Sequence, residues 1–396
     1  MKLQDIVSKY KDVQIITHND LDGYGAGAVL VATLVKLGFG MNNIKVTHTD
    51  YTDVFPVDPK YNLVLISDIS ISNANDAKKI IEFVKKPNNL LLWFDHHRSS
   101  LDLSINYPEL EKIPGIRSTA ACGTMLCYIF YQVINYYKGI KDALIDDVIK
   151  ELNNIDVPAI MKSNSPGIWN KDSSNRKTPI GILLTDDYDR FVLSDERSKY
   201  YMEAFNNYPG FEKNCKSGYF QTDYITGNDN EYINFIQNGR KIFTWKQILF
   251  LTSLKEYGFI ASFPKEGMNE IEMLCLNSTS KGSLMFGKSY GYGNDTILQY
   301  NYGCIYSSKG DKTTVSVYCA NPDPTPNYFK KIGKIYNAAD ICKRFDGGGH
   351  PGAAGFVTDK VPFCNIKPLP YALKKQIDDE ISELFTDLKR QIDIGD

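Results

Sequence analysis

The chain has 396 residues, of which 43% are hydrophobic and 23% are charged, and its formal net charge at pH 7 is −2. This length exceeds what one ordinary core accommodates, so we expect a soluble globular protein with two domains. The near-neutral charge argues against a protein that coats long nucleic acid electrostatically.

Membrane insertion and secretion are not indicated. No apolar run approaches the roughly 20 residues that a membrane span needs, and residues 1–5 lack the apolar segment of a signal peptide. The eight cysteines include no CxxC pair, so neither a disulfide framework nor a zinc knuckle is indicated. We therefore expect a reducing, cytoplasmic location.

The first half of the chain alternates between strand and helix patterns. Short apolar runs predict strands over residues 13–17, 44–48, 62–67 and 90–94, with helices over 25–37 and 75–84 between them. Further helices are predicted over 118–137 and 141–152, and another strand over 179–185. Near-continuous apolar strands separated by helices indicate an α/β fold, with a parallel sheet that has helices on both faces.

The composition changes at about residue 200, which predicts a linker over 201–240 and divides the chain into four parts. Residues 1–200 form a first α/β domain, 241–370 a smaller α/β domain and 371–396 a C-terminal helix. Within the smaller domain, strands are predicted over 270–276, 299–306, 314–319 and 355–357, and a helix over 338–344.

Acidic and imidazole side chains follow three of the predicted strands at the point where each ends. They are His18, Asp20 and Asp22 after the first strand, Asp68 after the third, and Asp95, His96 and His97 after the fourth. Ligands of open parallel sheets bind at the carboxyl ends of the strands. If these strands are neighbours, the side chains converge on one crevice.

The residue types indicate the chemistry of this crevice. Oxygen and imidazole donors without thiolate suit Mn²⁺ or Mg²⁺. The carboxylates are too many for one ion, which predicts two ions roughly 3.5–4 Å apart that clamp a phosphoryl group. Taken alone, Asp68 reads as the N-cap of a helix; the three strand ends together favour a metal site.

These residues resemble the DHH phosphoesterase superfamily. Residues 18–23 (HNDLDG), Asp68 and residues 95–97 (DHH) are similar to its first three motifs, and residues 345–356 (FDGGGHPGAAGF) to the glycine-rich signature of its DHHA1 substrate domain. Among its subgroups, the oligoribonucleases (nano-RNases) and RecJ-like exonucleases are the most similar. The resemblance spans nearly the whole chain, in the expected order.

The resemblance implies roles for the residues of the first domain. It places His18 and Asp20 on one cation and Asp22 and His96 on the other, with Asp68 bridging the two. It implies that His97 contacts substrate phosphate as a proton donor and that Asp95 orients an imidazole. The fourth family aspartate is predicted at Asp187, with Asp186 as the alternative.

Substrate contacts are expected in the second domain. The amides of Gly347, Gly348 and Gly349 are predicted to cradle an anion, with His350 and Arg344 beside them. Relatives carry a phosphate-binding arginine on a strand of this domain, whereas residues 314–319 contain none. Tyr318 is therefore predicted to stack a base.

The sequence thus predicts a two-metal phosphodiesterase, with Mn²⁺ preferred and Mg²⁺ as the alternative, that hydrolyses short single-stranded oligonucleotides to nucleoside monophosphates. The alternatives are action on pAp, linear or cyclic dinucleotides or polyphosphate, and a non-catalytic nucleotide-binding module. The expected partner is a nucleic acid or nucleotide substrate and no membrane, and a homodimer is compatible with the sequence.

Overall fold

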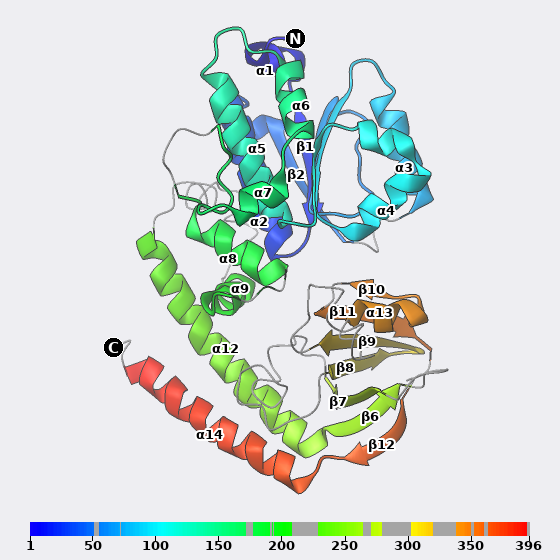
Figure 1. Cartoon of the computed structure of the whole chain (residues 1–396), viewed down its shortest axis with the longest axis vertical. Coiled ribbons are helices and arrows are strands. Elements are labelled where there is room, and N and C mark those ends of the chain that lie inside the picture. The colour runs from blue at the N-terminus through cyan, green and yellow to red at the C-terminus, as the bar shows by residue number, and fades with distance from the viewer. Residues whose placement is uncertain are drawn as a thin grey trace. The chain divides into compact units, whose positions relative to one another are not determined.

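The computed structural model describes residues 1–50, 55–71, 73–171, 177–190, 192, 194–207, 229–263, 271–278, 302–319, 338–349, 352–359 and 363–393. The chain divides into two compact units, Met1–Gly239 and Arg240–Asp396. Figure 1 shows both units and the helices and strands of each.

The first unit is built on a five-stranded sheet in the order β2-β1-β3-β4-β5, in which every pairing is parallel. Its strands are β1 (Val13–His18), β2 (Ile44–Thr49), β3 (Leu63–Ser67), β4 (Leu90–Asp95) and β5 (Gly115–Arg117). The predicted parallel sheet and α/β class are confirmed, and the short strand β5 is an addition to the prediction.

Helices precede, connect or follow these strands, and several of them cover the sheet (Figure 1). They are α1 (Ile6–Lys9), α2 (Leu21–Leu37), α3 (Ala74–Val84), α4 (Arg98–Asn106), α5 (Gly123–Lys138), α6 (Ile145–Asn153), α7 (Val157–Lys162), α8 (Ile180–Asp189) and α9 (Arg197–Asn207). Short 3₁₀ turns lie at Leu3–Asp5, Met41–Asn43 and Pro108–Lys112.

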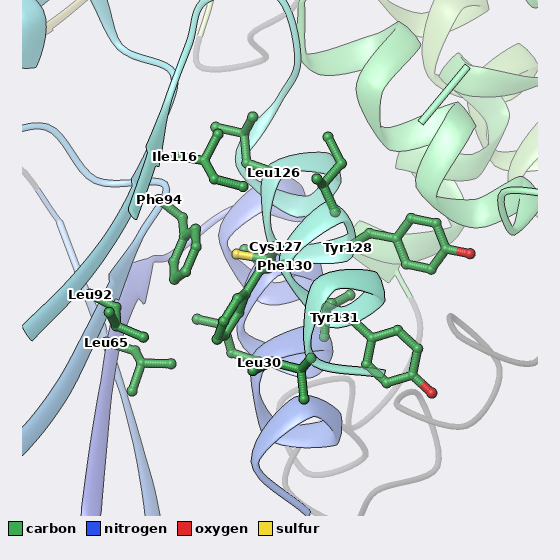
Figure 2. Close-up of a cluster of buried hydrophobic side chains, with 14 of the residues drawn as sticks. Leu30, Leu65, Leu92, Phe94, Ile116, Leu126, Cys127, Tyr128, Phe130 and Tyr131 are labelled. Atoms are coloured by element: carbon green, nitrogen blue, oxygen red, sulfur yellow. The ribbon is translucent and has the colours of Figure 1, made fainter. Parts of the chain in front are cut away.

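Apolar side chains on both faces of the sheet are buried, as expected for parallel strands between helices. On one face, Phe130 of α5 stacks on Phe94 of β4 with ring centroids 4.8 Å apart, and Leu65 and Leu92 lie beside them (Figure 2). On the other face, the fully buried Trp93 belongs to a second cluster with side chains of α3. The two clusters fix the sheet and therefore the positions of its strand ends.

One predicted element of the first unit was wrong in type, and another begins later than predicted. Residues 179–185, predicted as a strand, begin helix α8, because a short apolar run does not distinguish a strand from a buried helix. Helix α5 begins at Gly123 rather than near Ser118, whose hydroxyl instead accepts a hydrogen bond from the Ala120 amide at 3.2 Å. Both differences change which side chains reach the strand ends.

The second unit contains a mixed seven-stranded sheet in the order β10-β11-β9-β8-β7-β6-β12. Its strands are β6 (Phe259–Phe263), β7 (Ile271–Asn277), β8 (Tyr302–Lys309), β9 (Lys312–Cys319), β10 (Gly348–Gly349), β11 (Ala353–Thr358) and β12 (Cys364–Pro368). β7 and β8 run parallel, and the other pairs are antiparallel.

The remaining helices are α12 (Asp229–Tyr257), α13 (Ala338–Cys342) and α14 (Tyr371–Asp393). The boundary between the two units, at Gly239 and Arg240, falls within α12. A 3₁₀ turn at Lys343–Phe345 follows α13. α12 and α14 are joined by ion pairs, of which Arg240 Nη2–Asp387 Oδ1 is 3.1 Å long. No helix of the described part of the chain is both long and apolar enough to cross a bilayer.

Candidate metal centre

The carboxyl ends of β1, β3 and β4 lie side by side, because these parallel strands are consecutive in the sheet. β1 ends at His18, Asp68 follows β3, and β4 ends at Asp95 immediately before His96. The Asp68 amide donates a hydrogen bond of 2.9 Å to the carbonyl oxygen of Phe94, which ties the end of β3 to β4. The strand-end side chains therefore meet at one edge of the sheet, as predicted.

His18 and Asp20 form one side of the centre. His18 Nδ1 lies 2.8 Å from Asp20 Oδ2, and Asp20 also caps α2 by accepting a hydrogen bond of 2.9 Å from the Gly23 amide. Burial acts to raise the pKa of Asp20, but the hydrogen bond and positive charge of His18 outweigh it and lower that pKa to about 2. Ligand atoms of His18, Asp20 and Asp68 lie within 4.8 Å of one another.

The N-terminus of α5 holds Asp22. The amides of Gly123 and Thr124 donate hydrogen bonds of 2.6 and 2.7 Å to the two carboxylate oxygens of Asp22. The positive end of a helix dipole stabilises such a carboxylate. A Cβ atom on Gly123 would lie 2.6 Å from Asp68 Cβ, so only glycine fits at this position between the two aspartates.

Asp68 lies at the middle of the centre. It is 1% exposed and has a φ of 49°, an uncommon left-handed conformation for a residue other than glycine. Its Oδ1 lies 3.0 Å from His96 Nε2, whereas its buried Oδ2 accepts no hydrogen bond from the described residues. Burial, followed by the charges of Asp22 and Asp20, raises the pKa of Asp68 well above its usual 3.8. Such a carboxylate requires a proton or a cation.

Helix α8 adds Asp189 to the centre. Its Oδ2 lies 3.4 Å from His96 Nε2, and Asp22 Oδ2 lies 3.6 Å from the same nitrogen. Ligand atoms of Asp22, His96 and Asp189 form a group within 4.8 Å of one another. Burial, followed by the charges of Asp22 and Asp20, also raises the pKa of Asp189 well above its usual value. The Asp189 carboxylate, like that of Asp68, is therefore unfavourable to ionise without a cation beside it.

The two carboxylates predicted for this position have other partners. Asp187 Oδ1 accepts hydrogen bonds from the amide and hydroxyl of Ser194 at 2.8 and 2.5 Å, and Asp186 is bound by the Arg190 side chain. The structure therefore places Asp189 beside His96, where the sequence predicted Asp187 or Asp186. Residues 186–189 are helical, so their side chains point in different directions, and only Asp189 reaches the strand ends.

Asp95 orients His97. Its Oδ1 lies 2.8 Å from His97 Nδ1 and accepts a hydrogen bond of 2.9 Å from the His96 amide. Burial acts to raise the pKa of Asp95, but the charge and hydrogen bond of His97 outweigh it and lower that pKa. The contact favours the tautomer with the proton on Nδ1 of His97. The His97 side chain is 20% exposed, so this imidazole lies at the margin of the centre.

The donor set fits divalent cations. The three groups of ligand atoms contain carboxylate oxygens and imidazole nitrogens only, a combination that suits Mn²⁺ or Mg²⁺. Two buried carboxylate oxygens, Asp68 Oδ2 and Asp189 Oδ2, accept no hydrogen bond from the described residues. Cations would satisfy both oxygens and remove the repulsion that raises the two pKa values.

We expect the stabilisation by Mn²⁺ to grow as the pH rises. The pKa values of Asp68 and Asp189 are raised in the folded chain, so the metal-free fold binds more protons there than the unfolded chain. Its stability therefore falls as the pH rises from the usual 3.8 toward the raised values. Asp20, whose pKa is lowered to about 2, is ionised throughout this range. Burial acts to lower the pKa of His18, but the hydrogen bond and charge of Asp20 outweigh it and raise that pKa, so the loss of this proton near neutral pH lowers the metal-free stability in the same direction.

Cation binding requires these carboxylates to be ionised, so the cation and the proton compete. Thermal melts with Mn²⁺ and with a chelator, across roughly pH 5 to 8, should show a difference in Tm that widens with pH. A difference that narrows with pH would contradict this assignment.

The glycine-rich turn of the second unit is used largely for packing. The Gly347 amide donates a hydrogen bond of 3.0 Å to the Cys342 carbonyl, and Gly348 and Gly349 form β10, which pairs with β11. A Cβ atom on Gly347 would lie 2.3 Å from the Gly355 carbonyl oxygen. The Gly347 amide, predicted to face an anion, is therefore engaged within the fold, which corrects that part of the prediction.

The other predicted substrate contacts of the second unit differ in accessibility. Arg344 is exposed in the 3₁₀ turn after α13. Tyr318 on β9 is only 7% exposed, because β9 lies inside the sheet, so little of its ring is available for stacking on a base. His350 lies outside the described residues.

Comparisons with known proteins give structural likenesses at low sequence identity. No protein-family model and no curated protein matches the sequence. A pGpG-specific phosphodiesterase of Vibrio cholerae, PggH, aligns over 95% of this chain and 100% of its own, at 12% identity and a TM-score of 0.38. A Mn²⁺ complex of RecJ from Thermus thermophilus aligns over 98% of this chain and 53% of its own, at 14% identity and a TM-score of 0.39.

A DHH domain of a member of the s1p family of ribosomal proteins aligns over 97% of this chain and 88% of its own, at 13% identity and a TM-score of 0.46. This chain is thus similar to a DHH-domain structure, and it spans about half of that RecJ chain. At TM-scores below 0.5, these likenesses carry no conclusion about activity.

Proposed function

We propose that this chain is a metal-dependent phosphodiesterase of the DHH superfamily. The observation that carries the proposal is the meeting of ligand atoms at the carboxyl ends of three neighbouring parallel strands. These atoms form three groups, and within each group they lie within 4.8 Å of one another. Asp68 and His96 each belong to two of the groups, which links all three. A buried cluster of this kind contributes little to a core, because each ionised carboxylate is costly to bury without a partner.

Two divalent cations would be held by the two sides of this cluster. His18 and Asp20 would bind one, and Asp22, His96 and Asp189 would bind the other. Asp68, which groups with His18 and Asp20 and also contacts His96, would contribute to both. When bound, such a pair neutralises charge on a phosphoryl group and lowers the pKa of water.

The protein supplies orientation and proton transfer around the cations. Asp95 holds Nδ1 of His97, so Nε2 is the ring nitrogen that would face a phosphate oxygen or a leaving group, and it would donate a proton there from a ring that is protonated on both nitrogens. The α5 amides hold the Asp22 carboxylate in place. These contacts are made within the protein itself, and they would preorganise the centre for its task.

We propose short single-stranded oligonucleotides as the substrate and nucleoside monophosphates as the product. The near-neutral net charge supports a short substrate held at one local site rather than a long electrostatic track. The alternatives stand: pAp, linear or cyclic dinucleotides, polyphosphate, or nucleotide binding without turnover.

The test is a hydrolysis assay of the full chain with Mn²⁺ or Mg²⁺ on a panel of substrates. The panel contains a linear RNA dinucleotide, a longer single-stranded RNA, a cyclic dinucleotide, pAp and polyphosphate, with chelator and an Asp68→Asn variant as controls. We expect cation-dependent release of nucleoside monophosphates, fastest from the shortest RNA.

If the chain released phosphate only from pAp or only from polyphosphate, that compound would replace oligonucleotides as its proposed substrate. Binding of a dinucleotide without turnover of any substrate would indicate the binding module.

A further inference from the structure

Helix α8 carries three carboxylates in four residues, and each has a different set of partners. Asp189 reaches His96, Asp187 accepts hydrogen bonds from Ser194, and Asp186 pairs with Arg190. Only Asp189 belongs to the metal centre, so the other two are candidates for holding it in position.

The Arg190 guanidinium binds Asp186 through two hydrogen bonds. Nε lies 2.9 Å from Oδ1 and Nη2 lies 2.6 Å from Oδ2, the forked geometry of a strong arginine–carboxylate pair. Asp186 is 5% exposed, and the Arg190 side chain is 25% exposed. The pair is therefore largely removed from water and restricts the C-terminal turn of α8 more than an exposed pair would.

Asp186 also connects α8 to the N-terminus of α5. Its Oδ1 accepts a hydrogen bond of 2.8 Å from the Cys122 amide, and the next two amides of α5, from Gly123 and Thr124, hold Asp22. One helix N-terminus thus positions Asp22 directly. Through Asp186 and Arg190, it also positions the helix turn that presents Asp189.

We propose that Arg190 is a positioning residue of the metal centre. Its two hydrogen bonds to Asp186 lie within the end of α8 and fix that carboxylate where it accepts the Cys122 amide of α5, which keeps Asp189 beside Asp22 and His96. The inference rests on the proposed function, because it requires a cation on that side of the centre. It assigns Arg190 to the cation of Asp22, His96 and Asp189, and not to the cation of His18 and Asp20.

The test is Mn²⁺ binding by full-length Arg190→Gln, measured by calorimetry and by the spin resonance signal of free Mn²⁺. We expect one of two Mn²⁺ sites to weaken by about 10- to 100-fold, the usual effect of losing a partner outside the ligand shell. The other site should keep its affinity. Arg190→Lys should recover part of the loss, because lysine restores the charge without the fork.

Arg197→Gln is the matched control. Arg197 pairs with Asp195 at the same Nη2–Oδ2 distance of 2.6 Å, but with a side chain that is 53% exposed. This variant should bind both Mn²⁺ ions as the unsubstituted chain does.

Three results would overturn the proposal: unchanged affinity at both sites in Arg190→Gln, equal weakening of both sites, or the same loss in Arg197→Gln. If Arg190→Gln does not fold, Arg190→Lys decides by the same criteria. If the unsubstituted chain binds no Mn²⁺, the proposed function fails and this inference fails with it. If the unsubstituted chain and Arg190→Gln both bind two Mn²⁺ ions with the same affinities, the positioning role of Arg190 is overturned and the proposed function stands.

Discussion

Asp68→Asn is expected to lower cation-dependent phosphodiesterase turnover by more than about 100-fold, beyond the usual cost of losing a partner outside the ligand shell. Asp68 groups with His18 and Asp20 on one side of the centre, and its Oδ1 lies 3.0 Å from His96 Nε2 on the other side, so we expect an amide in its place to weaken both cations together. Steady-state hydrolysis of an RNA dinucleotide measures the loss, and calorimetric titration with Mn²⁺ shows whether both sites weaken.

The metal-free Asp68→Asn variant should remain folded and melt no lower than the metal-free parent. The reason is that burial and the neighbouring carboxylates already raise the pKa of Asp68 and favour its neutral form. Asp156→Asn is the matched control, because Asp156 caps α7 through the Ala159 amide and asparagine caps helices equally well. Turnover by Asp68→Asn close to that of Asp156→Asn would remove Asp68 from the centre.

Asp189→Asn should abolish tight binding at one cation site, whereas Asp187→Asn should leave both sites in place. Asp189 Oδ2 lies 3.4 Å from His96 Nε2, while the Asp187 carboxylate accepts hydrogen bonds from Ser194 and from the Asp195 amide. We expect Asp189→Asn to reduce turnover by more than about 100-fold, because the loss of a proposed ligand costs more than the loss of a partner outside the ligand shell.

Asp187→Asn should instead lower the free energy of unfolding by about 1.5 to 3 kcal/mol, the range for a hydrogen bond to a charged group. Denaturant unfolding and Mn²⁺ titration of both variants separate the two effects. The reverse pattern, with metal binding lost in Asp187→Asn and retained in Asp189→Asn, would restore the assignment predicted from the sequence.

The sequence was sufficient to locate the glycine-rich turn, but it did not show why the turn needs glycines. The turn at residues 347–349 stands where it was predicted, beside β11. Its glycines are required in part because backbone atoms of the neighbouring strand leave no room for a Cβ atom at Gly347. Close packing and anion binding both call for glycine, so composition does not distinguish them.

Local pattern was sufficient for the parallel sheet and for the residues at its strand ends. An apolar run that stops at a carboxylate or imidazole can be read from consecutive residues, and parallel strands bring their carboxyl ends to one edge. His18, Asp68 and His96 were identified in this way, and the structure brings them together. Their roles as ligands remain proposals that the experiments above test.

Tertiary structure alone decided which carboxylate of residues 186–189 lies beside His96 and what holds Asp22. The three aspartates of that stretch are equivalent in composition, and they differ only in helical direction and in the partners that the fold provides. Asp22 is held by the amides of Gly123, 101 positions away, and Thr124, and backbone amides carry no residue-specific signal. Contacts of this kind form only when packing places a helix end against a strand end, so no local pattern predicts them.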